Sequence, residues 1–367
     1  MKDPRMKKLA DLLVNYSVDV QPGEWVLIRG HLVAEPLANE VLRAVLEAGG
    51  NPNVSFYSDE IQEITYRFSD DDQLSWISPI ERLYYDEADV LIHLRGASNT
   101  RSLTGIDPQK QQLRNKSRQE LTELYMKRAA EGDLKWTLTD FPCPAYAQEA
   151  DMSLAEFEDF VFSATYVDQQ DPAAEWKRIH DQQQKVVDWL KGKKQVTVKS
   201  PHADLTLSID GRTFINSDGT NNMPSGEVFT GPVEDSANGW VEFTYPAIRK
   251  GREVAGIRLE FEDGKVIKAS AEKNEAYLQA MLDMDEGARY LGEFAIGTNY
   301  GIQKFTKSIL FDEKIGGSFH MALGAGYPET GSKNRSGIHW DMICDIKEDS
   351  EIRVDGELLY QDGKFVI

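Results

Sequence analysis

The fold of the first half of the chain is indicated by residues 23–58, which read GEWVLIRGHLVAEPLANEVLRAVLEAGGNPNVSFYS. Residues 23–30 and 51–58 are apolar runs typical of strands. Between them, residues 34–50 have helical periodicity and end in two glycines, which suit the C-terminus of a helix. A strand, a helix and a second strand in this order predict a βαβ unit with a parallel sheet.

The same alternation continues through the first half of the chain. Residues 89–96 and 135–142 predict further strands of this sheet. Residues 172–194 predict a helix that opens with a proline and closes with lysines, which suit its C-terminal dipole. We place a domain boundary just after this helix, near Lys194. The first domain, residues 1–194, is therefore expected to have an α/β fold.

The second half of the chain has a different pattern. Apolar and polar side chains alternate around Asp-Gly turn signals at residues 210–211 and 263–264, as they do in antiparallel hairpins. Residues 275–291 predict one amphipathic helix among these strands. We expect residues 195–367 to form an α+β domain with mostly antiparallel strands. Two domains also suit a chain of 367 residues, since a single core usually serves at most roughly 250–300.

Composition excludes several classes of protein. The chain has 41 Lys and Arg against 61 Asp and Glu, a net charge of −20, which repels phosphate backbones and argues against a nucleic-acid partner. No apolar run approaches the roughly 20 residues of a membrane span, and the N-terminus lacks the apolar stretch of a secretory signal. Cys143 and Cys344 lack the spacing of a thiolate zinc site. We expect a cytoplasmic protein without a membrane partner.

One pair of metal-binding residue types lies in residues 337–346, which read GIHWDMICDI. On a strand, alternate side chains share a face, so His339 and Asp341 would point to the same side. An imidazole nitrogen and a carboxylate on one face can bind the same metal ion. A structural hydrogen bond between the two side chains explains this segment equally well.

Three more residues are candidates, each with a simpler alternative. His320 shares its predicted strand face with two small residues, which leave space in front of the imidazole, although a core histidine is the commoner case. Glu293 lies in an apolar strand and needs a cation if it is buried, for which Arg289 is an alternative partner. Glu227 follows a glycine turn, where a solvent-exposed position is the simpler interpretation.

Four segments carry a family resemblance. Residues 222–232 (NMPSGEVFTGP), 285–293 (DEGARYLGE), 311–330 (FDEKIGGSFHMALGAGYPET) and 334–343 (NRSGIHWDMI) resemble, in order and spacing, the bacterial thermophilic metallo-aminopeptidases of the aminopeptidase T and aminopeptidase S type. The first half of the chain is similar to that family mainly in its layout of strands and helices. The resemblance implies a cytoplasmic, homodimeric exopeptidase with an α/β N-terminal domain and a C-terminal domain that binds two divalent metal ions.

The resemblance also implies roles for single residues. A tyrosine of the family falls on Tyr327, whose hydroxyl could donate a hydrogen bond to the oxyanion. The chemistry also needs a group that moves the proton to the leaving amine, for which Glu293 or Glu313 is the candidate. The stretch between Glu313 and His320 is longer than in typical members, so it stays open whether Glu313 is a further ligand or a base. The metal ligands carried over from the family are Glu227, Glu293, His320, His339 and Asp341.

The predicted function is therefore a metal-dependent aminopeptidase. It would release N-terminal residues from peptides with a free N-terminus, using a water activated at two ions of zinc, cobalt, manganese or magnesium. Two other functions stay open: another two-metal hydrolase, such as an amidohydrolase or phosphoesterase, and a non-catalytic metal-binding module. Phosphoester substrates need basic groups near the metals. The segments offer Lys304, Lys307, Lys314, Lys333 and Arg335.

Overall fold

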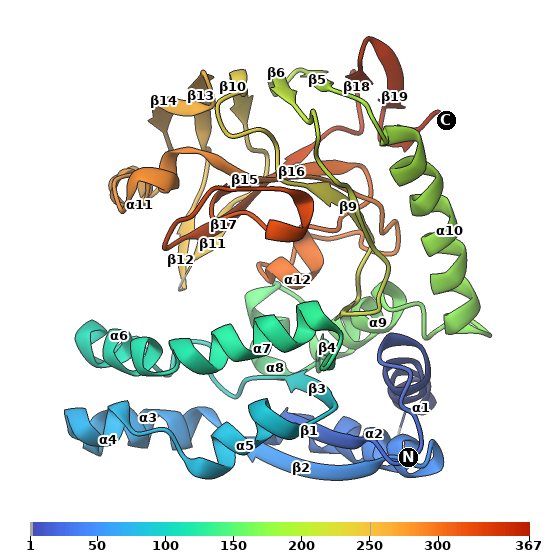
Figure 1. The fold of residues 1–367 in the computed structure, drawn as a ribbon, viewed down its shortest axis with the longest axis vertical. Helices are drawn as coiled ribbons and strands as arrows, with labels where there is room; N and C mark the ends of the chain where they lie inside the picture. The colour runs from blue at the N-terminus through green and yellow to red at the C-terminus, as the bar shows by residue number, and fades with distance from the viewer. Residues whose placement is uncertain (1–2, 250) are drawn as a thin grey trace. The chain divides into compact units, whose positions relative to one another are not determined.

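The structure of the protein is a computed structural model that describes residues 3–249 and 251–367. The chain forms two compact units (Figure 1). Each unit combines two separate parts of the chain, so the chain passes from one unit to the other three times. The first unit is formed by Met1–Ala173 with Gly219–Met223, and the second by Ala174–Asp218 with Pro224–Ile367.

This division differs from the boundary expected near Lys194. The helix predicted over residues 172–194 is present as α10 (Pro172–Leu190), but almost all of it belongs to the second unit. The short strand β8 (Asn222–Met223) belongs to the first unit, although it follows α10 in the sequence. It does so because β8 pairs with the edge of the sheet of the first unit, at Leu138 and Thr139.

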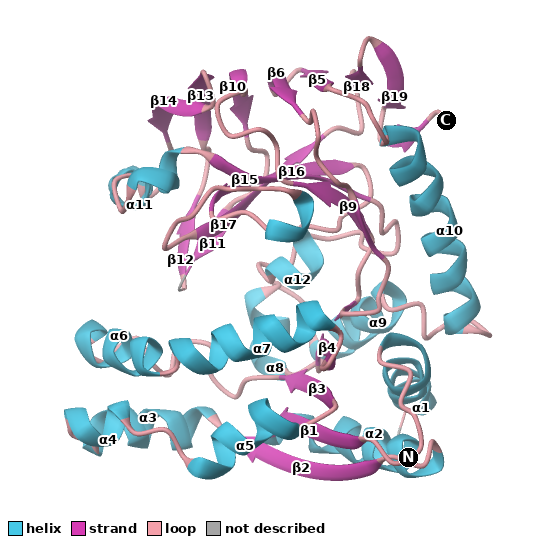
Figure 2. Ribbon diagram, in the orientation of Figure 1, coloured by secondary structure: helices cyan, strands magenta, loops and turns pink. Residues whose placement is uncertain are grey.

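Five parallel strands form the sheet of the first unit, in the spatial order β2-β1-β3-β4-β8. Strands β1 to β4 are labelled in Figure 2. The βαβ unit expected over residues 23–58 is present, and the α/β fold of this half is confirmed. Val26, Ile28, Val90 and Ile92 are fully buried on one face of the sheet. The other strands of the sheet are β1 (Trp25–His31), β2 (Asn51–Tyr57), β3 (Val90–Arg95) and β4 (Lys135–Asp140).

Two helices of the first unit begin with a capping box, in which side chains satisfy the free amide groups of the first turn. Asp70 and Gln73 form a capping box at α4, and Ser153 and Glu156 form another at α9, which satisfies amide groups that would otherwise lack partners. The helices are α1 (Pro4–Leu12), continued by a π-helical turn (Leu13–Ser17), α2 (Glu35–Glu47), α3 (Asp59–Phe68), α4 (Asp71–Ser75), α5 (Pro79–Glu87), α6 (Pro108–Ser117), α7 (Gln119–Glu131), α8 (Pro144–Glu149) and α9 (Leu154–Ala164). A 3₁₀ turn spans Leu32–Ala34.

The second unit contains antiparallel sheets, which confirms the predicted α+β class. An eight-stranded sheet has the order β14-β13-β10-β6-β5-β18-β19-β20, a five-stranded sheet has the order β17-β16-β15-β9-β7, and β11 pairs with β12 (Figure 2). Side chains of the two larger sheets share one hydrophobic core. The strands are β5 (Gln195–Ser200), β6 (Ala203–Ser208), β7 (Ile215–Ser217), β9 (Glu227–Thr230), β10 (Asn238–Glu242), β11 (Ala247–Arg249), β12 (Arg252–Val254), β13 (Arg258–Glu262), β14 (Lys265–Ser270), β15 (Leu291–Gly297), β16 (Ser318–Gly324), β17 (His339–Asp345), β18 (Glu351–Val354), β19 (Glu357–Gln361) and β20 (Lys364–Phe365).

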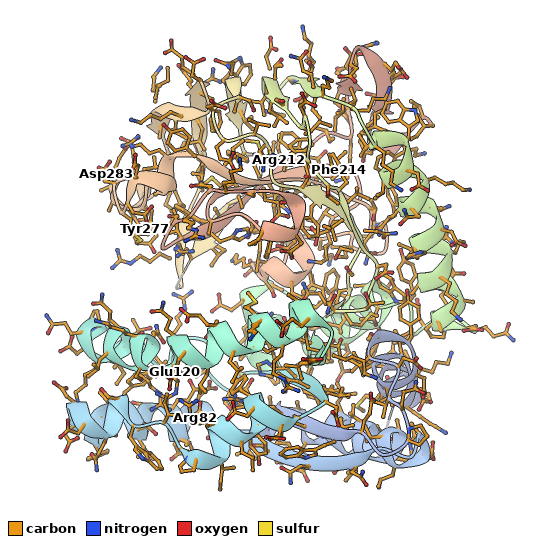
Figure 3. All side chains as sticks on the ribbon, in the orientation of Figure 1. Arg82, Glu120, Arg212, Phe214, Tyr277 and Asp283 are labelled. Atoms are coloured by element: carbon orange, nitrogen blue, oxygen red, sulfur yellow. The ribbon has the colours of Figure 1, made fainter. Side chains whose placement is uncertain are left out.

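The single helix expected over residues 275–291 is wrong in its length. Helix α11 (Glu275–Leu282) ends early, at Asp283, and the chain resumes as a 3₁₀ turn before β15. Asp285 explains the break, because its carboxylate accepts hydrogen bonds from the Ser336 hydroxyl and the Gly337 amide, far away in the sequence. Tyr277 on α11 and Asp283 at its end are labelled in Figure 3. The remaining helical segments of this unit are α12 (Ile309–Asp312) and 3₁₀ turns at Glu286–Arg289 and Pro328–Thr330.

None of the helices within residues 3–249 and 251–367 is long and apolar enough to cross a membrane.

Candidate metal centre

The five-stranded sheet brings the predicted ligands together. Glu227 begins β9, Glu293 lies in β15 and His320 in β16, and β17 carries His339 and Asp341. These four strands are consecutive neighbours in the sheet. Residues between the ligands along the strands, namely Phe294, Phe319, Met321, Trp340 and Met342, are buried in the core. Strand alternation therefore places the ligands on the opposite face, as the sequence predicts.

Glu293 lies between the two imidazoles. His320 Nε2 is 3.3 Å from Glu293 Oε1 and 3.4 Å from Glu227 Oε2. His339 Nε2 is 3.4 Å from Glu293 Oε2 and 3.3 Å from Asp341 Oδ1. Each oxygen of the Glu293 carboxylate thus faces a different histidine.

The ligand atoms form three groups, each compact enough to hold a metal ion. In every group the three ligand atoms lie within 4.8 Å of one another. Glu293 belongs to two of the groups, and Glu313 joins His320 and Asp341 in the third. The groups are Glu227, Glu293 and His320; Glu293, His339 and Asp341; and Glu313, His320 and Asp341.

Unsatisfied polar atoms at this place fit bound cations. Among the residues that the structure describes, buried His320 Nδ1 has no hydrogen-bond partner, and buried Glu227 Oε2 and Asp341 Oδ1 have only the imidazole contacts given above, which do not have hydrogen-bond geometry. A buried polar atom without a partner is costly, and a buried carboxylate more so. Carboxylate oxygens and imidazole nitrogens are the donors that divalent transition metals bind in proteins. The residues present therefore suit divalent metal ions.

A backbone hydrogen bond orients one of the histidines. His339 Nδ1 lies 2.7 Å from the carbonyl oxygen of Ala325, so this nitrogen donates and Nε2 is left to face the carboxylates. Gly324 makes this approach of the chain possible. Its φ is +100°, and a Cβ atom there would lie 2.1 Å from the carbonyl oxygen of Ile338.

The carboxylates hold positive charge on both imidazoles. Burial works to lower the pKa of His320, but the hydrogen bond to Glu293 and the charge of Glu227 raise it to about 9. Burial also opposes protonation of His339, whose pKa is nevertheless raised to about 12, mainly by Asp341. Burial favours the neutral form of Asp341, yet the charge of His339 lowers its pKa to about 2. Without metal, the two imidazoles therefore keep their added protons up to alkaline pH. A metal ion that binds an imidazole nitrogen would replace the proton on that nitrogen.

Glu313 and Lys314 complete the charged cluster. Burial raises the pKa of Glu313 to about 7, against the opposing charge of Lys314. The Lys314 side chain is fully buried, forms an ion pair with Glu313, and lies with its Nζ 3.5 Å from Glu227 Oε1. The sequence offered Lys314 only as one of five basic groups for a phosphate. The sequence shows that Lys314 directly follows Glu313, but it does not show that the lysine side chain is buried.

Tyr327 lies against the same cluster. Its ring centroid is 5.2 Å from that of His339 and 5.6 Å from that of Phe229. Burial, followed by the negative charges of Glu293 and Asp341, raises the pKa of the phenol above its usual range. Tyr327 therefore keeps its proton and can donate a hydrogen bond.

Comparison with known proteins also indicates a metal-binding protein. The family model of thermophilic metalloproteases (M29) matches residues 2–365. Aminopeptidase 2 of Geobacillus stearothermophilus is 28% identical, over 99% of this chain and 95% of that protein. Aminopeptidase T of Thermus thermophilus is 26% identical, over 98% and 95%.

Two solved structures share the fold. Wild-type AmpT from Thermus thermophilus superposes with a TM-score of 0.86 at 23% identity, covering 99% of each chain. A 2,5-dihydroxypyridine dioxygenase from Pseudomonas putida KT2440 has a TM-score of 0.62 at 13% identity, over 100% of this chain and 98% of that one. One fold thus serves two chemistries, so fold alone does not decide activity.

The family model is more specific than the fold, since it matches nearly every residue of the chain. Metalloproteases hydrolyse peptide bonds with the help of a divalent metal ion, and the cluster around Glu293 has the donors for one. This chain belongs to the family of thermophilic metalloproteases, M29.

Proposed function

We propose that this protein is a metal-dependent aminopeptidase, which releases N-terminal residues from peptides at a two-metal site. The observation that carries the proposal is the position of Glu293, within 3.4 Å of both His320 Nε2 and His339 Nε2. The names of the curated relatives, all aminopeptidases, support the same activity.

Two ions fit the grouping of the ligands better than one. Glu227 and His320 would bind one ion, and His339 and Asp341 would bind the other. Glu293 belongs to both groups of ligands. Two ions held by these residues would supply the Lewis acidity of a two-metal hydrolase. Mixed nitrogen and oxygen donors favour zinc, cobalt or manganese over magnesium, which prefers oxygen donors.

The protein residues would orient the substrate and move its proton. Bound divalent ions supply Lewis acidity, which polarises the scissile carbonyl and lowers the pKa of a water. Glu313, with a pKa of about 7, suits a general base that takes a proton from the water and passes it to the leaving amine. Glu293 is less suited, because both of its oxygens already face imidazoles. The Tyr327 hydroxyl would donate a hydrogen bond to the oxyanion.

Recognition of a free N-terminus follows from charge. The site contains the carboxylates of Glu227, Glu293, Glu313 and Asp341. An α-ammonium group is attracted to such a cluster, whereas an acetylated N-terminus carries no charge. Lys314, the basic residue that contacts the cluster, is already paired with Glu313, so its ammonium group is not free to bind a phosphate. The residues therefore favour peptides over phosphoesters.

Hydrolysis of aminoacyl-p-nitroanilides tests the proposal. The protein is assayed with free and N-acetylated substrates, before and after EDTA, with Zn²⁺, Co²⁺, Mn²⁺ or Mg²⁺ added back and p-nitrophenyl phosphate as the competing substrate. We expect cleavage of the free substrates only, lost with EDTA and restored by metal. Cleavage of the acetylated substrate, or activity that persists in protein shown to be metal-free, would refute it. Phosphatase activity without peptide cleavage would favour the phosphoesterase.

We also propose a cytoplasmic homodimer, as the family resemblance implies. Large apolar side chains are exposed along α3, the segment after α4 and helix α5, with Phe68 at 80% and Trp76 at 62%. Apolar surface of this extent commonly marks an interface, so Phe68→Glu should shift the sedimentation coefficient from dimer to monomer, while Ser98→Glu should not. The residues are Ile61, Ile64, Phe68, Trp76, Ile80 and Leu83.

A further inference from the structure

The buried lysine beside the ligands is not accounted for by the proposed mechanism. Lys314 has no exposed side-chain surface, and its amine contacts Glu313 and lies 3.5 Å from Glu227 Oε1. The backbone holds the residue on both sides: its amide donates to the carbonyl of Phe311, and its carbonyl accepts from the amide of Asn299, both at 3.0 Å. The amine is thus directed into the cluster by fixed backbone.

An ammonium group at this position offsets the repulsion between neighbouring carboxylates. Lysine is rarely buried unless it is paired, and here both partners are carboxylates of the candidate site. Carboxylates packed this closely repel one another, and a cation between them offsets that repulsion. The imidazole of His339 lies against Glu293 and Asp341, and that of His320 lies against Glu293 and Glu227, so Lys314 is the cation that contacts Glu313.

The total charge of the site with two bound metal ions also supports a charge-balancing role for Lys314. Glu227, Glu293, Glu313 and Asp341 carry four negative charges, which two divalent ions would cancel. With Lys314 included, the net charge of the loaded site would be +1, and a positive site favours polarisation of a carbonyl group. In effect, Lys314 offsets Glu313, the carboxylate that joins the third group of ligand atoms.

We propose that Lys314 is a positioning residue of this site, whose ammonium group holds Glu313 and Glu227 in place and balances the charge of Glu313. This inference rests on the proposed two-metal function for its role in catalysis. Its contribution to the metal-free protein does not depend on that function. The competing explanation is that the lysine stem only fills space in the core.

A double-mutant cycle in the metal-free protein separates these explanations. Thermal unfolding is measured for Lys314→Met, Glu313→Gln and the double variant, with Lys304→Met as the control, since Lys304 is an exposed lysine of the preceding loop. Methionine keeps the length of the side chain and removes its charge. We expect Lys314→Met to lower the midpoint by at least about 5 °C, and Lys304→Met to leave it within about 1 °C.

The decisive result is the interaction between the two substitutions. If Lys314 balances charge, adding Glu313→Gln restores most of the midpoint that Lys314→Met loses, because the uncompensated carboxylate is removed as well. If the lysine only fills space, the two losses add, and that result overturns the proposal. Should Lys314→Met fail to fold without metal, folding of the double variant under the same conditions supports the proposal, and its failure contradicts it.

Added metal provides a second readout without any assay of activity. Zn²⁺ or Co²⁺ should raise the midpoint of Lys314→Met by more than it raises that of the wild type, because the ions supply the missing positive charge. An equal rise in both proteins contradicts the charge-balancing role. Neither measurement requires peptide cleavage, so a failed aminopeptidase assay and a failed role for Lys314 are distinguishable.

Discussion

Two histidines with little exposed surface, one in each unit, have pKa values shifted in opposite directions. His93 in β3 accepts or donates a hydrogen bond at 3.1 Å with the Tyr57 hydroxyl, and burial together with the charges of Arg29 and Arg95 lowers its pKa to about 4. His320 in β16 is more deeply buried, yet Glu293 and Glu227 raise its pKa to about 9. Burial opposes protonation at both residues, so the neighbours decide the charge.

This difference indicates where a cation can bind. An ion beside His93 would meet two guanidinium groups and one carboxylate, Asp140, that is already paired with Arg95. An ion beside His320 would meet the carboxylates of Glu293 and Glu227. Within the described residues, every group of side chains with metal-binding geometry lies in the second unit. A buried histidine is therefore informative about metal only together with the charges around it.

The largest expected effect comes from removing the shared carboxylate. If neighbouring charge decides where metal binds, Glu293→Gln should lower kcat/KM for aminoacyl-p-nitroanilides by at least about 1,000-fold, a loss of about 4 kcal/mol of transition-state stabilisation, and should lower bound metal per chain. His93→Gln is the matched control and should retain metal and activity. Normal metal content in Glu293→Gln would contradict the idea that neighbouring carboxylates decide which buried histidine binds metal.

The next effect is the pH dependence of metal binding. The pKa of His320 is raised to about 9 and that of His339 to about 12, so below pH 9 an incoming ion must displace protons. Affinity for Zn²⁺ should therefore rise with pH, by at least about tenfold per unit and about 100-fold between pH 6 and 8. Calorimetry in buffers of different ionisation enthalpy measures the released protons. A flat affinity would show that the imidazoles are not protonated.

His93 should make stability depend on pH in the acid range. Its pKa is about 4 in the folded protein and about 6.5 in the unfolded chain. The stabilisation is fully present above pH 6.5 and is lost as the pH falls through 6.5 toward 4, because only the unfolded chain takes up the proton. At pH 5 the loss is about 2 kcal/mol. Urea unfolding at pH 5 and 7.5 should show a difference that His93→Gln reduces by this amount.

The smallest effect concerns the N-terminal cap of helix α9 in the first unit. The Ser153 hydroxyl accepts a hydrogen bond from the amide of Glu156 at the start of α9, and its loss in Ser153→Ala should cost about 1 kcal/mol of unfolding free energy. Metal content should be unchanged. Ser98→Ala, at an exposed position in a loop, should have no measurable effect. Loss of metal in Ser153→Ala would mean that general stability, and not local charge, controls the site.

Local patterns were predictable, and distant contacts were not. The strands over residues 23–58 and the shared face of His339 and Asp341 follow from periodicity within a few residues. The early end of α11 depends on Asp285 and its hydrogen bonds to residues about fifty positions away. The burial of Lys314 similarly depends on Glu227, which comes from another strand. The five ligands were chosen by family resemblance, and their roles stay predictions.

The division of the chain also constrains how the protein can be synthesised. Strand β8 covers the edge of β4 but is encoded after α10. When residue 173 leaves the ribosome, the parallel sheet still lacks its last strand, which follows only with residues 222–223. An uncovered strand edge can pair with other chains, and after residue 173 the edge of β4 stays open for about 50 further residues of translation. At typical rates this lasts about 3 to 10 s, a window in which a chaperone would have its greatest effect on yield.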